Sequence, residues 1–214
     1  MTTETLRCFI AISLPLPLRE RLVRAQELCA RSHVRVSWVS PENLHLTLAF
    51  LGYIVEATLD PLRTGLDQVT AGVRPFRMKV AGAGTFGRPG FPRVVWAGIE
   101  GPPAELQRIH VGLTALLKGL GIPQEDRPFA PHITLGRVRE SIPRRAGSRA
   151  LQRKTALEGS RPREPLAALT SALASIKNDA FGDVQVGCLL IMRSHLEQPR
   201  VRYSVLHESP LRGT

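Results

Sequence analysis

The sequence predicts an α+β fold built from two lobes of similar plan. The main observation is an internal repetition, because residues 41–48 read PENLHLTL and residues 128–135 read PFAPHITL. Strand-like and helix-like patterns flank both segments, which favours a duplicated unit whose equivalent strands face one another. With 214 residues, 43% of them hydrophobic, the chain is expected to form one bilobal domain over 1–214.

The first third of the chain contains three expected strands and two expected helices. RCFIAIS has strand composition and stops before two prolines, and the next segment carries its apolar residues on one helical stripe. A Pro-containing turn at 40–43 then introduces the apolar run of the first repeat. The expected order is strand 7–13, helix 18–31, strand 34–38, strand 44–51 and helix 57–70.

The middle of the chain predicts a hairpin, a helix and a further strand. Residues 76–86 and 93–99 read as strands separated by the turn sequence GRPG. Alternating glycines at Gly82 and Gly84, inside the first of these strands, indicate a bulge or a close approach to the cleft. Prolines 102 and 103 suit the first turn of a helix that ends at Gly121, and a strand over 132–138 follows.

The C-terminal part predicts a helix over 165–177 and a final hairpin. Its strands are expected at 184–193 and 201–206, with the turn at Gln198 and Pro199. Before them, residues 137–163 hold nine Arg or Lys and two Glu, with few apolar residues. The segment at about 139–163 is therefore expected to be an exposed, flexible basic loop, which is either a solvated charge run or an arm that guides RNA.

The overall charge favours an anionic partner. The formal net charge is +11, and 25 of the 29 basic residues are Arg. Two explanations fit the excess of Arg over Lys: a GC-rich genome favours Arg codons, and Arg binds phosphate in a bidentate way. Three widely spaced cysteines without a C-x-x-C pair imply neither a disulfide framework nor a zinc knuckle. With no signal peptide and no membrane-spanning run, a cytoplasmic monomer that does not bind membranes is expected.

The two repeats present the residues that carry chemistry. Residues i and i+2 of a strand share a face, so His45 lies beside Thr47, and His132 lies beside Thr134. Two imidazoles near their usual pKa can hold opposite protonation states, as the hydrolysis of a cyclic phosphodiester requires of its acid and its base. The Thr hydroxyls can donate hydrogen bonds to the non-bridging phosphate oxygens, and no metal or cofactor is required.

Other kinds of site find little support. The remaining histidines have no partner at a telling spacing, and His110, on the polar side of its helix, is expected to be structural. Neither H-E-x-x-H nor clustered acidic residues are present to hold a metal, and a P-loop, a dinucleotide-binding motif and a serine nucleophile elbow are missing.

The paired H-L-T-L and H-I-T-L resemble the double signature of the two-histidine phosphoesterases. The chain resembles most closely the bacterial and archaeal RNA 2′,3′-cyclic phosphodiesterases, also called 2′-5′ RNA ligase-like proteins. Supporting segments include WVSPENLHLTLAFLG, RPFAPHITLGRVR and LLIMRSHLEQPRVRYSVLHESPL, so the resemblance extends over nearly the whole chain. It implies a bilobal fold with two antiparallel sheets lining a central cleft and helices outside.

The resemblance also implies hydrolysis of RNA 2′,3′-cyclic phosphate ends to 2′-phosphomonoesters. In that pattern His45 is the proton donor and His132 the proton acceptor, and Arg137 contacts the phosphate. Strict alternation would put Arg137 on the face opposite His132, so either a bulge at Gly136 or the end of the strand is expected to redirect it. Phe9, on the non-core face of its strand, is expected either to line the cleft or simply to pack in the sheet.

Two other functions remain open from the sequence. One is a 2′-5′ RNA ligase, which would run the same site in reverse and join a 2′,3′-cyclic phosphate to a 5′-hydroxyl. The other is a non-catalytic basic module that binds RNA in a salt-dependent way. Loss of both histidines would leave the affinity of such a module intact.

Overall fold

The computed structural model describes residues 5–88, 90–124, 128–139, 163–196 and 201–213. In these ranges nine strands form one sheet in the order β7-β4-β5-β6-β3-β1-β8-β9, with β2 paired to β6, and every pairing is antiparallel. The strands are β1 (Thr5–Ser13), β2 (Val36–Trp38), β3 (His45–Val55), β4 (Phe76–Arg88), β5 (Phe91–Glu100), β6 (His132–Val138), β7 (Ala180–Val186), β8 (Cys188–His195) and β9 (Arg202–Pro210).

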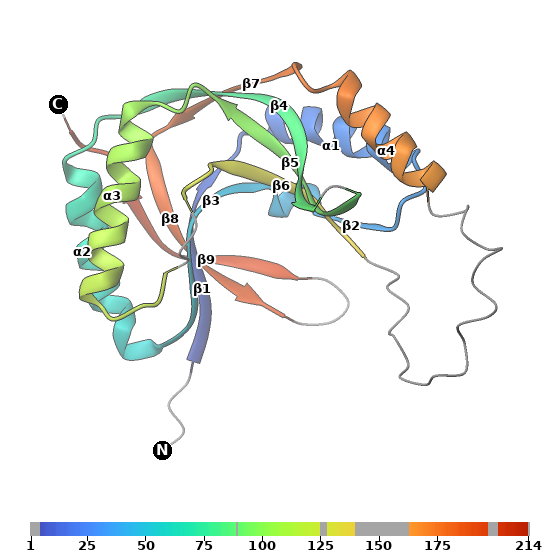
Figure 1. The fold of residues 1–214 in the computed structure, drawn as a ribbon. Helices are drawn as coiled ribbons and strands as arrows, with labels where there is room; N and C mark the ends of the chain where they lie inside the picture. The colour runs from blue at the N-terminus through green and yellow to red at the C-terminus, as the bar shows by residue number, and fades with distance from the viewer. Residues whose placement is uncertain (1–4, 89, 125–127, 140–162, 197–200, 214) are drawn as a thin grey trace, which may run out of the picture.

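Apart from β2, which pairs with β6, the sheet consists of two four-stranded halves that meet at the repeated motifs. One half is β7-β4-β5-β6 and the other is β3-β1-β8-β9, and the register between them pairs Leu46 of β3 with Ile133 of β6. The expected bilobal arrangement with antiparallel sheets is therefore confirmed. The two sheets are continuous through this short junction and curl around it (Figure 1).

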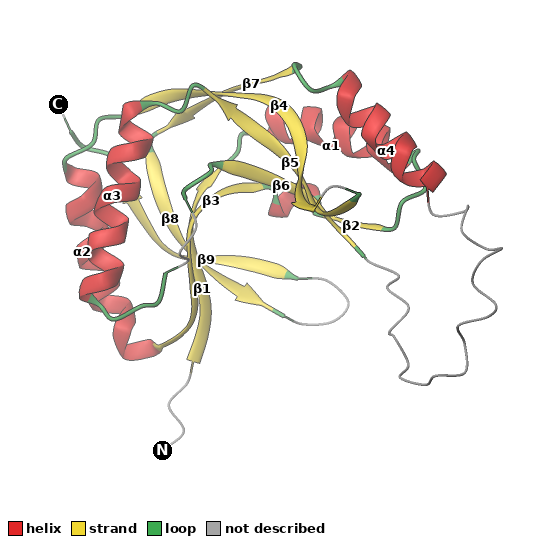
Figure 2. Ribbon diagram, viewed as in Figure 1, coloured by secondary structure: helices red, strands yellow, loops and turns green. Residues whose placement is uncertain are grey.

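The helices lie outside the sheet, as Figure 2 shows. Helices α2 (Leu59–Ala71) and α3 (Ala104–Gly119) pack side by side, and α1 (Leu16–Ala30) lies against α4 (Arg163–Ser175) (Figure 1). Short 3-10 turns, η1 (Pro41–Asn43) and η2 (Glu56–Thr58), precede β3 and α2. The prolines before α3 lie outside the helix, with Pro103 as its N-cap, and Gly121 follows its end with φ +66°.

The core is aliphatic, in keeping with the scarcity of aromatic residues. Leu46 and Ile133 are completely buried in it, together with Ile10 of β1 and Leu106 of α3. Among the described residues, no helix combines the length and the apolar character needed to cross a membrane.

The C-terminal hairpin differs from its prediction in two ways. Strand β9 continues to Pro210, beyond the expected end at 206, and the first strand is divided. The segment expected as a single strand over 184–193 is divided at Gly187: β7 pairs with β4 in one half, and β8 pairs with β1 in the other. The two pieces form one continuous apolar segment of the sequence. The hydrophobic pattern therefore does not reveal that the chain passes from one half of the sheet to the other. The expected turn at 198–199 and most of the expected basic loop (140–162) lie outside the described residues.

The junction between the halves makes a testable contribution to stability. Leu46→Ala should lower the free energy of unfolding by about 2–5 kcal/mol, because it opens a cavity in the completely buried contact with Ile133. Val111→Ala is the control, since this side chain on α3 is 59% exposed and its loss should cost less than about 0.5 kcal/mol. Urea unfolding measures both. Equal losses in the two variants would contradict the structural role of the junction.

Candidate active site

The repeated motifs face one another across the junction of β3 and β6. When the Leu46–Ile133 register is extended by one residue in each direction, His45 lies opposite Thr134 and Thr47 lies opposite His132. Leu46 and Ile133 point into the core, so the imidazoles and hydroxyls share the opposite face. Each histidine is thus placed beside the threonine of the other motif.

Equivalent β-bulges interrupt the two motifs at their final leucine. On β3 the register to β1 passes over Leu48, and on β6 the register to β5 passes over Leu135. The second bulge turns Arg137 toward the face that Thr134 occupies, so the expected redirection is confirmed, one residue earlier than Gly136. The equivalent position after the first bulge holds Phe50, which sequence reasoning did not single out.

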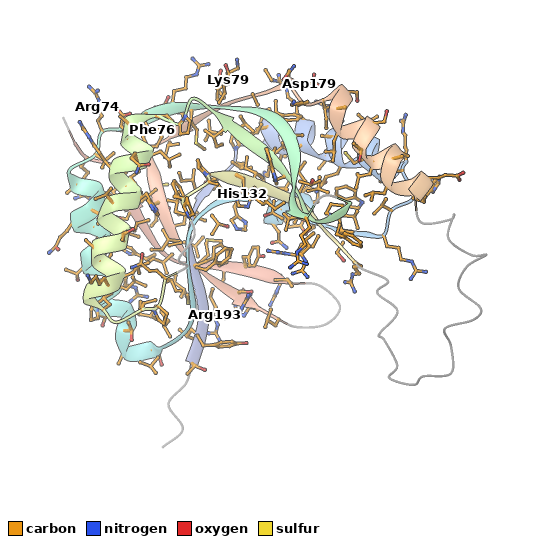
Figure 3. The ribbon with its side chains drawn as sticks, in the orientation of Figure 1. Arg74, Phe76, Lys79, His132, Asp179 and Arg193 are labelled. Atoms are coloured by element: carbon orange, nitrogen blue, oxygen red, sulfur yellow. The ribbon has the colours of Figure 1, made fainter. Side chains whose placement is uncertain are left out.

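A cavity of about 1200 Å³ adjoins these residues. It is lined by Thr47, His132, Thr134 and Arg137, four of the predicted site residues, and by parts of β4, β5 and α3. Figure 3 shows His132 near the centre of the molecule, whereas Lys79 and Asp179 lie at its periphery. The other predicted histidine, His45, does not line this cavity.

The two histidines are held by the same backbone contact. The Nδ1 atom of His45 lies 2.7 Å from the carbonyl oxygen of Asn43, and Nδ1 of His132 lies 2.8 Å from that of Ala130. A carbonyl oxygen can only accept a hydrogen bond, so in both rings Nδ1 carries a proton and donates the hydrogen bond. Nε2 of each ring is thereby left to accept or donate a proton in the reaction.

His45 packs against two aromatic rings, which also contact each other. Phe9 stacks on it with a centroid distance of 4.8 Å, and Tyr203 of β9 meets it edge-on at 5.4 Å. Burial lowers the pKa of His45, and the hydrogen bond to the carbonyl of Asn43 opposes this effect. Phe9 is buried but lies outside the main core cluster, so it packs against the histidine on the same face of the sheet.

Tyr203 links this aromatic group to two arginines, and the sequence contains no signal for its role. Burial raises the pKa of its hydroxyl, whereas the positive charges of Arg7 and Arg137 oppose that rise. Arg7 is oriented by a hydrogen bond of 3.1 Å from Nη1 to the hydroxyl of Ser194. The face that carries His45 is therefore electropositive.

His132 has a more open aromatic environment. Phe86 of β4 meets its ring edge-on at 4.8 Å, and Phe86 also packs against Trp96 of β5 at 5.3 Å. The indole of Trp96 passes over Gly84 at a spacing that would exclude a Cβ atom. The register of β4 shifts near Gly82, whose φ is +74°, so the expected bulge is confirmed, whereas neither Gly82 nor Gly84 lines the cavity beside His132.

His110 lines the same cavity as His132, although the sequence suggested a structural role for it. Its ring stacks on Phe129 with a centroid distance of 4.1 Å and an interplanar angle of 8°. Phe129 belongs to the second repeated segment, and its place in the repeat is the signal that could have drawn attention to this end of the cavity. In the described ranges, no three His, Cys, Asp or Glu side chains gather as a metal site would require.

Comparisons with known proteins agree with this geometry. A family model described as LigT like Phosphoesterase matches residues 12–96 and 99–156. An RNA 2′,3′-cyclic phosphodiesterase of Methanothermobacter thermautotrophicus is 32% identical over 192 residues, which cover 89% of this chain and 90% of that protein. The protein of the same name from Aeropyrum pernix is 30% identical over 190 residues, 88% of this chain and 93% of its own length.

Solved structures with the same fold extend over nearly the whole chain. A crystal structure of a Thermus thermophilus protein has a TM-score of 0.74 at 30% identity and covers 97% of this chain and 99% of its own. E. coli LigT complexed with 3′-AMP has a TM-score of 0.72 at 27% identity, with the same coverage. The sequence match, the shared fold and the paired motifs together show that this chain belongs to the LigT-like phosphoesterase family.

Proposed function

We propose that this protein hydrolyses RNA 2′,3′-cyclic phosphate ends to 2′-phosphomonoesters, without a metal, through His45 and His132. The observation that carries the proposal is the matched orientation of two imidazoles on one face, each with Nδ1 bound to a carbonyl and Nε2 left for the substrate. The relatives named RNA 2′,3′-cyclic phosphodiesterase support the choice of substrate.

The reaction needs a proton removed on one side of phosphorus and one delivered on the other. His132 takes a proton from water, whose oxygen attacks phosphorus as the bond to the 3′ oxygen breaks. His45 gives its proton to that leaving oxygen, so the phosphate remains on the 2′ oxygen. Because the two rings come from neighbouring strands of different halves, they can act from opposite sides of the phosphate.

The developing charge on the phosphate is met by three further groups. Thr47 and Thr134 are placed to donate hydrogen bonds to the non-bridging oxygens. Arg137 lines the cavity near the end of β6, and its permanent positive charge can bind the same oxygens. Phe9 contributes by enclosing His45 and fixing the plane of its ring.

If His45 is the proton donor, its imidazole must be protonated at both nitrogens before the reaction. Burial lowers its pKa in the free protein, so a smaller fraction of His45 carries the second proton near neutrality than of an exposed histidine. An anionic phosphate beside the ring favours the charged form and raises the pKa. Substrate binding would thereby favour protonation of His45 just before it donates its proton.

The biological setting that we propose is a cytoplasmic protein that acts as a single-domain monomer on RNA. The complete motif pair within one chain supports the monomer, because both histidines come from the same molecule. The net charge of +11 supports an anionic macromolecule as the substrate.

Removal of either imidazole should abolish hydrolysis. His45→Ala and His132→Ala are each expected to lower kcat by roughly 10²–10⁴-fold or more, because each removes one of the two proton transfers. Turnover of a 2′,3′-cyclic nucleotide in EDTA measures the effect. His33→Asn is the control, since this exposed histidine has φ +59°, which Asn tolerates, and it should retain full activity. Full activity in either active-site variant would refute the two-histidine mechanism.

The enclosure of His45 by Phe9 can be tested by titration. Phe9→Ala admits water to the ring and should raise the pKa of His45 toward its usual range, whereas Phe9→Leu should keep it lowered. NMR titration of the imidazole protons gives both values. Addition of a nucleoside 2′-monophosphate should raise the pKa in the unaltered protein. A pKa that stays unchanged or falls in Phe9→Ala would contradict burial as its cause.

The two other functions give different results in the same assays. A non-catalytic RNA-binding module would show no turnover, and its salt-dependent RNA affinity would survive the loss of both histidines. A ligase would join tRNA halves that end in a 2′,3′-cyclic phosphate and a 5′-hydroxyl. In water, at low concentrations of 5′-hydroxyl ends, hydrolysis is the expected direction.

A further inference from the structure

The cavity beside His132 is larger than one terminal nucleotide needs. Its volume of about 1200 Å³ exceeds the roughly 300–1,000 Å³ typical of sites for small ligands. The proposed reaction occupies the part around Thr47, His132 and Thr134. The remainder extends along β4 and β5 on one side and along α3 on the other.

The two ends of the cavity differ in charge. Arg88 and Arg93 line the end formed by β4 and β5, and Arg137 lies next to it, because it pairs with Val94 of β5. No carboxylate is found among the described residues that line the cavity. The α3 end is lined instead by apolar side chains, by the uncharged polar residues Thr114 and Gln124, and by the His110–Phe129 stack. Burial lowers the pKa of His110.

Exposed aromatic rings accompany the arginines. Four of the seven phenylalanines of the chain line this cavity, although aromatic residues make up only 5% of the sequence. Phe91, at the start of β5, is 66% exposed, and Phe50 is 49% exposed. Burial therefore does not explain their position. Aromatic rings interleaved with cations are the pattern that binds single-stranded nucleic acid, because bases stack on the rings and phosphates pair with the cations.

The backbone of the β4–β5 hairpin presents Phe91 and Arg88 together. These two residues pair in the register, and the turn between them includes Gly90 with φ +77°. A Cβ atom at Gly87 would collide with the backbone at Phe91 and Arg93, so glycine permits the close approach of the two strands there. In Figure 1 the joined ends of β4 and β5 lie on the same side of the molecule as α4.

We propose that the hairpin end of β4 and β5 binds the nucleotide that precedes the cyclic phosphate end, with its base stacked on Phe91 and its phosphodiester paired with Arg88. This inference rests on the proposed hydrolysis and specifies its substrate class. The protein acts on the ends of RNA oligonucleotides in preference to free cyclic mononucleotides. The uncharged α3 end is left for the terminal base.

A comparison of two substrates tests this preference. The unaltered protein should show a higher kcat/KM for a dinucleotide with a 2′,3′-cyclic phosphate end than for the cyclic mononucleotide. Phe91→Ala and Arg88→Ala should lower kcat/KM for the dinucleotide at least about fivefold and leave that for the mononucleotide unchanged. Tyr53→Ala, which removes an aromatic ring with the same 66% exposure but outside the cavity lining, and Arg24→Ala, an exposed arginine on α1, are the matched controls.

A binding measurement separates this proposal from the hydrolytic function. Fluorescence anisotropy with a labelled dinucleotide that ends in a 2′-phosphate should show weaker binding for Phe91→Ala and Arg88→Ala than for the two controls, whether or not turnover occurs. Absence of turnover by the unaltered protein would overturn the proposed function alone. Equal kcat/KM for both substrates, or equal binding by Phe91→Ala and Tyr53→Ala, would overturn the hairpin subsite.

Discussion

The contact between Leu46 and Ile133 is the constraint on which the site depends. It joins two four-stranded halves at a point where both strands carry an H-x-T-L motif, and its burial fixes which face of each strand meets the core. A shift of one residue in either strand would turn the imidazole of that strand into the core and expose its aliphatic side chains instead. Packing and chemistry therefore specify the same register.

The two halves are alike in backbone and different in side chains, and the proposed mechanism assigns its acid and its base according to this difference. Both histidines bond to a carbonyl two residues earlier, and both motifs bulge at the same leucine. Phe9 and Tyr203 enclose His45, whereas His132 borders the open cavity. After the bulges, one half presents Phe50 and the other Arg137. A symmetric frame thus holds an asymmetric pair, as a reaction with distinct entering and leaving oxygens requires.

The sequence was sufficient for the paired motifs and for most of the elements around them, because period-two and helical patterns depend on local burial. Thr47, Thr134 and Arg137 could be placed on one face from alternation and a single expected bulge. Tyr203 and Arg7 could not be predicted in this way, since strand pairings between distant parts of the chain bring Tyr203 to His45 and the charge of Arg7 to Tyr203. The crossing of the chain between halves at Gly187 was missed for a related reason, because an apolar run looks the same whichever strand it joins.

In the proposed mechanism, one imidazole directs water to phosphorus and the other delivers a proton to the 3′ oxygen. The most direct test is to hydrolyse a dinucleotide that ends in a 2′,3′-cyclic phosphate, in ¹⁸O-labelled water with EDTA, and to analyse the product by ³¹P NMR. The expected result is a single product, the 2′-phosphomonoester, with one labelled oxygen on its phosphate. A 3′-phosphomonoester, or hydrolysis that occurs only after a divalent metal is restored, would contradict this mechanism.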